Sequence, residues 1–190
     1  MPAGKLSPLS YLILGLLRDG TASHGYRLLA QHKALSGITT NTGNIYRELG
    51  VLQRAEFVVP TEPDGEQKTI PYYITVAGER DFDRWLLDPA TLENHSQMST
   101  WILFAASVPR EDRVEILESL RERIWLQSKG VERARSDALR TIKNNGKAHE
   151  YHPAPFLLLR ELKHLTADLD FLEEFRAALE ALDQASGSAV

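Results

Sequence analysis

The stretch Thr39–Ala55, which reads TTNTGNIYRELGVLQRA, decides how the first half of this 190-residue chain folds. Its apolar residues Ile45, Leu49 and Leu52 stand at positions i, i+4 and i+7, a spacing that brings side chains to one face of an α-helix. Such a face packs against a protein core, because packing removes apolar surface from water. The spacing therefore predicts an amphipathic helix over residues 39–55 with one buried face.

The opposite face of this predicted helix is polar and basic. At about 100° per residue, Arg47, Arg54 and Gly43 fall on the side away from Ile45. Three polar residues flank them: Thr40, Asn44 and Tyr46. Guanidinium, amide and hydroxyl groups bind base edges and phosphates in the major groove of DNA, but any surface helix also has a solvated polar face. Composition alone leaves both interpretations open.

Two shorter helices are predicted before this segment. Ser7 and Pro8 form a helix start, with an N-cap hydroxyl followed by proline at the first helical position. Gly20 provides a residue that tolerates the left-handed conformation after the helix ends. A second helix is expected from about Ser23 to Ala34.

A β-hairpin is predicted after the third helix. Residues 57–59 and 70–75 have the composition of short strands, and a polar segment that contains Asp64-Gly65 separates them. Three helices followed by a hairpin form a winged helix-turn-helix, in which the third helix enters the major groove and the hairpin touches the flanking backbone. We therefore expect a mostly α-helical protein with a small β-hairpin.

Long amphipathic helices dominate the second half of the chain. Helices are predicted over residues 75–87, 96–107, 110–144 and 156–182. In the last two, apolar residues recur at spacings of three and four: Val114, Leu117, Leu120, Ile124 and Val131, then Leu158, Leu162, Leu165, Leu169, Leu172 and Leu179. These seams predict an antiparallel hairpin of two long helices that leaves apolar surface for a second copy. We divide the chain into a winged helix-turn-helix DNA-binding domain, residues 1–88, and an α-helical dimerisation and effector domain, residues 89–190.

Four sequence elements follow one another in a recognisable order: LSPLSYLILGLL at 6–17, HGY at 24–26, GNIYR at 43–47, and YYIT at 72–75 followed by Ala77-Gly78. In order and spacing, over roughly residues 6–86, they resemble the PadR family of bacterial transcriptional regulators. The chain length resembles the longer PadR subfamily, which adds a C-terminal helical dimerisation domain. The resemblance implies a homodimer that binds a double-stranded DNA operator, usually as a repressor and less often as an activator. Some members release DNA when a phenolic acid or a drug-like aromatic compound binds.

DNA contacts are expected from the second and third helices and from the wing. The candidate residues are His24, Tyr26, Thr40, Thr42, Gly43, Asn44, Tyr46, Arg47 and Lys68. Thr40, Asn44 and Arg47 are expected at base edges or phosphates. His24 is expected at the DNA backbone, with a local helix cap as the alternative. Tyr46 is expected either at a phosphate or as a bridge to the wing.

Three features depart from the family pattern. The wing commonly carries a basic tip in the family, but here Lys68 is its only basic residue, beside three acidic ones. Gly50 lies inside the third helix, where glycine costs about 1 kcal/mol relative to alanine. Glu56 stands where the family usually has the glycine that ends this helix. We therefore expect the wing to contact phosphates weakly or from a different place.

An effector site is expected near the junction of the two domains, where ligands sit in the longer PadR relatives. Aromatic residues supply the material for an apolar pocket there: Tyr11, Trp85, Trp101, Phe104 and Trp125. The alternative for each of them is an ordinary place in the core.

The net charge of −4 argues against a strongly basic nucleic-acid binder. Residues 23–55, however, hold four basic residues and a single acid, Glu48. The presumed DNA face is therefore locally basic inside an acidic protein. We expect few phosphate contacts per subunit and an affinity that depends weakly on salt.

Several classes of function are excluded or disfavoured. The chain has no cysteine, so it forms no disulfide and no thiolate metal site. It has no phosphate-binding loop, nucleophile elbow or dinucleotide fingerprint, and we expect no enzyme, catalytic residue, cofactor or metal. No apolar run is long enough for a membrane span and no signal peptide is evident, so a cytoplasmic protein, nucleoid-associated when bound to DNA, is expected.

Two other functions remain as alternatives. The acidic wing favours a winged-helix module that binds proteins and not DNA. A metal-dependent enzyme would have to be built on His149, His152 and His164.

Overall fold

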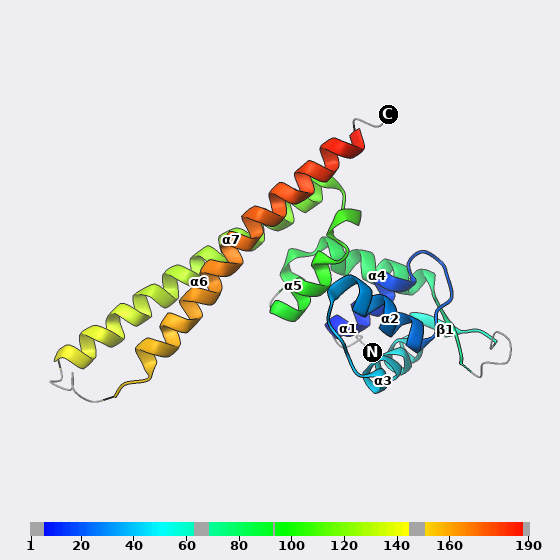
Figure 1. Cartoon of the computed structure of the whole chain (residues 1–190), viewed down its shortest axis with the longest axis horizontal. Coiled ribbons are helices and arrows are strands. Elements are labelled where there is room, and N and C mark those ends of the chain that lie inside the picture. The colour runs from blue at the N-terminus through cyan, green and yellow to red at the C-terminus, as the bar shows by residue number, and fades with distance from the viewer. Residues whose placement is uncertain (1–5, 63–68, 93, 145–150, 188–190) are drawn as a thin grey trace. The chain divides into compact units, whose positions relative to one another are not determined.

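The computed structural model describes residues 6–62, 69–92, 94–144 and 151–187. In this part of the chain the protein is mostly α-helical with one two-stranded antiparallel sheet, as predicted (Figure 1). The elements in chain order are α1 (Pro8–Leu17), α2 (Gly25–Ser36), α3 (Thr42–Arg54), β1 (Val58–Pro60), β2 (Tyr72–Ile74), α4 (Val76–Leu87), the 3-10 helix η1 (Pro89–Thr91), α5 (His95–Ile102), the 3-10 helix η2 (Ala105–Ser107), α6 (Arg110–Asn144) and α7 (Ala154–Gly187).

The chain divides into two compact units, Met1–Pro109 and Arg110–Val190. The segment 89–109 belongs to the first unit because α5 packs on α1. The division into domains after residue 88 stays a prediction.

Helix α1 is the centre of the first unit and packs against α2, α3, α4 and α5. Its buried apolar side chains are Leu12, Ile13, Leu14 and Leu17. The predicted stripe of α3 meets this core, since Ile45, Leu49 and Leu52 are completely buried. Burial of one such side chain contributes about 2 kcal/mol to stability. The apolar face of α3 is thereby buried in the core, and Gly43, Arg47 and Arg54 on the other face are exposed.

The wing is joined to the start of α2 through the backbone. Strands β1 and β2 pair with Val58 opposite Ile74, Val59 opposite Tyr73 and Pro60 opposite Tyr72. Ser23, just before α2, exchanges two backbone hydrogen bonds with Tyr72, of 3.1 and 3.0 Å. The position of the sheet is therefore tied to the helix that precedes α3.

The end of α3 is held in an unusual conformation. Glu56 has φ of 62°, in the left-handed region that favours glycine. Its N–H donates to the carbonyl of Gln53, and the N–H of Phe57 donates to the carbonyl of Leu52, the two hydrogen bonds of a Schellman motif. The hydroxyl of Thr75 donates to the Glu56 carbonyl at 2.7 Å. The motif that glycine usually closes is thus closed here by glutamate.

The second unit consists of α6 and α7, which lie side by side as an antiparallel hairpin (Figure 1). The buried seam contains Leu117, Leu120 and Ile124 from α6 and Leu165, Leu172 and Leu179 from α7. Cross-helix contacts run in opposite directions along the two helices, with Arg121 bonded to Glu173 at 2.7 Å and Gln127 to Glu161 at 3.5 Å. The predicted hairpin is confirmed.

Candidate nucleic-acid interface

Asn41 determines where the candidate recognition helix α3 begins. Its side-chain oxygen accepts a hydrogen bond from the Gly43 N–H at 2.7 Å, and its carbonyl accepts one from the Asn44 N–H at 3.0 Å. The helix therefore starts at Thr42, and the prediction that it starts at Thr39 is wrong by three residues because an amide side chain caps it. Thr40 precedes the helix and is half-buried, whereas Gly43 is exposed on its first turn.

Arg47 lies on the outer face of α3 with its side chain 66% exposed. Its Nε–H donates to Oε1 of Glu48 at 3.1 Å, and its Nη2 forms an ion pair with the same oxygen, also at 3.1 Å. The other carboxylate oxygen, Oε2, accepts hydrogen bonds from the hydroxyls of Ser7 at 2.6 Å and Ser10 at 2.7 Å. A single carboxylate thus connects the start of α1 to the arginine of the recognition helix.

Glu48 is buried, with only 8% of its side chain exposed. Burial raises the pKa of its carboxyl group, but hydrogen bonds from Ser7, Ser10 and Arg47 and the charge of Arg47 outweigh burial, and the pKa lies below its ordinary value. Glu48 is therefore an ionised group held inside the protein. Among residues 23–55 it is the only acid, so α3 itself exposes no carboxylate.

Tyr46 packs on the start of α2. A β-carbon added at Gly25 would lie 2.7 Å from Cζ of the Tyr46 ring, closer than real contacts allow. The Tyr26 ring meets the Tyr46 ring edge-on, with centroids 6.0 Å apart. Burial, followed by the neighbouring Tyr26 and Tyr72, raises the pKa of Tyr46. The glycine of the HGY triplet is thus explained by the close approach of this ring.

His24 is the N-cap of α2. Its Nδ1 accepts a hydrogen bond from the Arg27 N–H at 3.3 Å, which is the alternative that the sequence left open. Because Nδ1 accepts, a neutral His24 carries its proton on Nε2, which is free to act as a donor. The ring of exposed Tyr26 lies nearby, with centroids 6.4 Å apart. The cap and a contact to a phosphate are therefore compatible.

The structure brings most of the predicted DNA-contacting residues together on α2 and α3. Lys68 lies outside the described residues, as does the rest of the acidic wing tip at 63–67.

Four of the five predicted effector residues belong to the first unit, and three of them, Tyr11, Trp85 and Phe104, are linked through Phe82 in one aromatic cluster. Tyr11 stacks on Trp85 with centroids 4.5 Å apart, and the Trp101 indole N–H donates to the Leu86 carbonyl at 2.9 Å. The Phe104 ring covers Gly15 and meets Phe82 edge-on.

The surroundings of these aromatic side chains are typical of a core. Burial, with a smaller contribution from Asp81, raises the pKa of Tyr11 to about 12, and Trp85 and Trp101 are buried. Trp125 belongs to α6 in the second unit and is 49% exposed. A ligand in the cluster of the first unit would have to replace contacts that the aromatic side chains already make.

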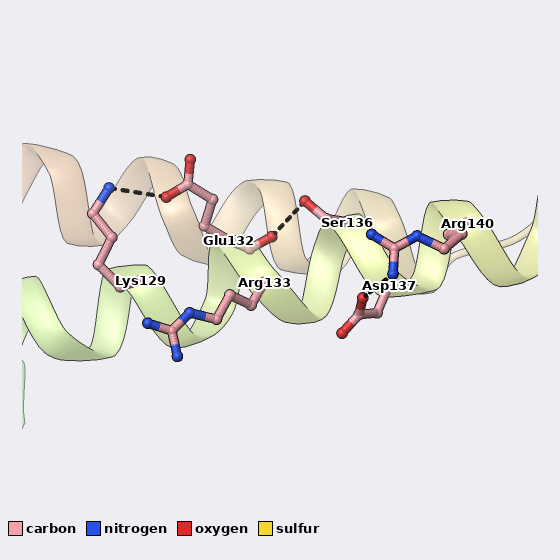
Figure 2. A pocket seen from close by; sticks show the side chains of 6 residues that line it. All are labelled: Lys129, Glu132, Arg133, Ser136, Asp137 and Arg140. Carbon is pink, nitrogen blue, oxygen red and sulfur yellow. Dashed lines mark hydrogen bonds and ion pairs between the residues drawn. The ribbon is translucent and has the colours of Figure 1, made fainter.

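A shallow groove along α6 is a competing candidate site (Figure 2). It is lined by Lys129, Glu132, Arg133, Ser136, Asp137 and Arg140. Lys129 pairs with Glu132 at 3.0 Å and Arg140 with Asp137 at 3.3 Å, so most of its charges neutralise one another along the helix. The Ser136 hydroxyl donates to the Glu132 carbonyl and has no base beside it among these lining residues. The groove has the properties of a solvated helix surface and not of an active site.

No three His, Cys, Asp or Glu side chains in residues 6–62, 69–92, 94–144 and 151–187 are grouped so that they could hold a metal ion. His149 is not in these ranges. Within the same part of the chain, no helix combines the length and the apolar character needed to cross a lipid bilayer.

Sequence reasoning missed the role of Glu48 and its two serine partners. One signal was available, because a step of about 100° per residue places Glu48 only about 60° from Ile45, beside the buried stripe. An acid at such a position needs a partner in the core. The partners themselves lie 41 and 38 residues earlier in the chain, and no local pattern identifies them.

Comparisons with known proteins identify a family domain within the first unit. Residues 13–84 match the transcriptional regulator PadR-like family. No curated protein matches the chain. Among solved structures, Bacillus subtilis PadR in complex with operator DNA is 20% identical, covers 92% of this chain and 99% of its own, and has a TM-score of 0.40.

Two further structures are similar over different lengths. The PadR-like transcriptional regulator BC1756 from Bacillus cereus is 17% identical, with 91% and 98% of the two chains covered and a TM-score of 0.36. Protein TA0346 from Thermoplasma acidophilum is 25% identical, with 40% and 72% covered and a TM-score of 0.37. These low TM-scores add no argument to the family match. The match confirms the resemblance: residues 13–84 form a domain of the transcriptional regulator PadR-like family.

Proposed function

We propose that this chain is a homodimeric transcriptional repressor that binds a pseudo-palindromic DNA operator through α3. The family match supports DNA-dependent regulation as the general function. Thr42, Gly43 and Asn44 on the first turn of α3 and Arg47 on the second turn are the candidate contacts with base edges or phosphates. His24, Tyr26 and Tyr46 lie beside them at the start of α2 and serve the DNA backbone or the placement of α3.

One observation carries this proposal: the recognition face exposes its arginine while the nearby acid is turned inward. Arg47 is 66% exposed, and the Glu48 side chain beside it is 8% exposed and bonded to serine hydroxyls. DNA binding needs cations that phosphates and base edges can reach, and an exposed carboxylate on the same face would oppose it. The inward acid explains how a protein of net charge −4 can present a face that suits DNA.

The test begins with the operator, which is obtained by selecting genomic fragments that the purified protein retains. Arg47→Ala should then weaken operator binding by about 1–3 kcal/mol if the guanidinium reads a base. Gel-shift titrations at one fixed salt concentration measure the change. Arg140→Ala, which removes an equal charge from an exposed pair on α6, is the matched control and should bind like the unaltered protein. Equal affinities for the Arg47→Ala protein and the control contradict the proposal.

The homodimer is proposed to form through the helical hairpin. Large apolar side chains are exposed on it, among them Trp125, Leu126, Leu139, Phe156 and Leu157. Exposed apolar groups in this number favour association with a second copy, which would remove them from water. Light scattering at micromolar concentration should give twice the mass of the 21.4 kDa chain, and a monomeric mass would exclude this part of the proposal.

A small aromatic effector is proposed to bind near the aromatic cluster of α1, α4 and α5. Tyr11 and Trp85 stack there, and a planar ligand that displaces one of the rings would find the same apolar surface. Titration with phenolic acids should quench the tryptophan fluorescence and release the operator over the same concentration range. Quenching without release would show binding that has no regulatory effect.

A further inference from the structure

We propose that Glu48 is a positioning residue for DNA reading: it holds one edge of the Arg47 guanidinium so that the opposite edge faces the DNA. This inference rests on the proposed function, because it names how α3 discriminates between sequences. Glu48 is buried, whereas Arg47, the candidate base contact that it would position, is exposed. It also assigns a role to Ser7 and Ser10, which lie outside α3.

The carboxylate is fixed at both of its oxygens. Oε2 accepts from Ser7 at 2.6 Å and from Ser10 at 2.7 Å, and both serines belong to the start of α1. Ser10 is completely buried, so water does not replace its hydroxyl easily. With Oε2 held from α1, Oε1 keeps a constant direction toward the surface. It is this oxygen that accepts from Arg47.

The geometry divides the five N–H donors of Arg47 into two groups. The Nε–H donates to Oε1 of Glu48 at 3.1 Å, and Nη2 lies 3.1 Å from the same oxygen in an ion pair. The hydrogens of Nη1 and Nη2 remain as donors for a ligand. An Nη1–Nη2 edge can bind O6 and N7 of guanine or two phosphate oxygens in a bidentate manner. Glu48 therefore binds the Nε side of the guanidinium. It restricts the rotation of the Nη1–Nη2 edge, which is the edge that would bind DNA.

The positioning of Arg47 by Glu48 favours the operator, whereas the negative charge of Glu48 lowers the affinity for any DNA. A negative group near the recognition face repels phosphates on every DNA, whatever its sequence. Its removal should raise non-specific affinity through charge and lower operator preference through the loss of positioning. These opposite signs separate the proposal from a purely electrostatic role.

The experiment compares the full-length protein with its Glu48→Gln variant on two duplexes of equal length, the selected operator and an unrelated sequence, at one salt concentration. Glutamine keeps the shape of glutamate and loses its charge. We expect the preference for the operator over the unrelated duplex to fall by on the order of tenfold, the discrimination that one bidentate pair provides. The affinity for the unrelated duplex should stay equal or rise. If both affinities rise by the same factor, the positioning role is overturned.

The Arg47→Lys variant provides a second measurement, and it keeps Glu48 and its two serine partners unchanged. Lysine keeps the positive charge but has no planar guanidinium group with two hydrogen-bonding edges. The operator preference of the Arg47→Lys protein should therefore fall about as far as that of the Glu48→Gln protein. The double variant should lose little more than either single variant, because both changes remove one interaction. Additive losses overturn the proposal. Glu122→Gln on the exposed surface of α6 is the matched control for the loss of one negative charge and should leave the operator preference unchanged.

The outcomes also separate this inference from the proposed function. If the unaltered protein prefers no DNA sequence, the proposed function fails and the inference fails with it. If the unaltered protein prefers its operator and Glu48→Gln keeps that preference in full, only the inference fails. Thermal melting followed by circular dichroism shows whether each variant is folded at the temperature of the binding assay.

Discussion

Among the residues that the structure describes, each of the two compact units buries one charged side chain at a helix contact, and the two charges have different sets of partners. In the hairpin, Arg113 has 5% of its side chain exposed and forms an ion pair with Asp183 across the two helices. In the first unit, buried Glu48 accepts from two neutral hydroxyls as well as from Arg47, whose side chain stays mostly exposed. The hairpin pair uses a buried cation to hold one helix to another. In the first unit the hydroxyls hold the anion together with the arginine, and the cation is not buried.

The largest expected effect tests whether the apolar seam, and not its ion pairs, carries the stability of the hairpin. Leu172→Ala removes a buried side chain of α7 and should lower the free energy of unfolding by about 3 kcal/mol. Denaturant titration followed by circular dichroism measures the change. Lys163→Ala, at an exposed position of the same helix, should change it by less than about 0.5 kcal/mol. Similar losses in both variants would mean that the seam is not the main support.

The next effect concerns the ion pair of the hairpin. Asp183→Ala leaves Arg113 buried without this carboxylate and should cost about 2 kcal/mol, below the 3–5 kcal/mol of a fully buried pair because Asp183 is 31% exposed. Asp137→Ala breaks an exposed pair with Arg140 and should cost less than about 1 kcal/mol. If the two variants melt alike, the buried cation of the hairpin gains no more stability from its partner than an exposed cation does.

A smaller effect of the opposite sign is expected at the end of α3. Glu56→Gly relieves a left-handed backbone and should stabilise the protein by about 1 kcal/mol. Gly20 has a similar φ of 75° with nothing within 4 Å of an added β-carbon, so Gly20→Ala should destabilise by about the same amount. Thermal melting of both variants measures these changes. A loss of stability in Glu56→Gly would show that the glutamate side chain has a role that outweighs the strain.

The smallest effect is the dependence of stability on pH. The pKa of Glu48 is lowered in the folded protein, so its contribution is present above the unfolded pKa and is lost as pH falls through the folded pKa. The unaltered protein should therefore lose more stability than Glu48→Gln between about pH 6 and pH 3. Urea titrations at several pH values give both curves. Parallel curves would mean that the hydroxyls and Arg47 do not favour the ionised form.

Much of this fold could be predicted because its signals are local. The spacing of Ile45, Leu49 and Leu52 predicted the buried face of α3, and the hydroxyl cap at Ser7 marked the start of α1. The long helix was predicted over residues 110–144, the range it occupies. Each of these signals depends on residues less than one or two helical turns apart.

Other features could not be predicted from nearby residues. The helix predicted over residues 96–107 is divided, because α5 ends at Ile102 and a 3-10 turn follows at Ala105–Ser107. Arg47 was expected on the outer face, but its connection to Ser7 and Ser10 depends on how α1 packs on α3. Packing of distant segments is a tertiary property, and sequence spacing does not contain it.

The double use of the Ser7 hydroxyl has a consequence for folding. Its oxygen caps α1 by accepting from the Ser10 N–H at 3.1 Å, and its hydrogen goes to Glu48. A ten-residue helix is marginal by itself in water, because its first turn is costly to form. The Ser7 hydroxyl that caps α1 thus donates to Glu48 only when α3 is docked. The two helices should therefore form in one cooperative step. Once α1 is formed and packed on α3, the hydrogen bonds from Ser7 and Ser10 to Glu48 also fix the direction of the Arg47 side chain.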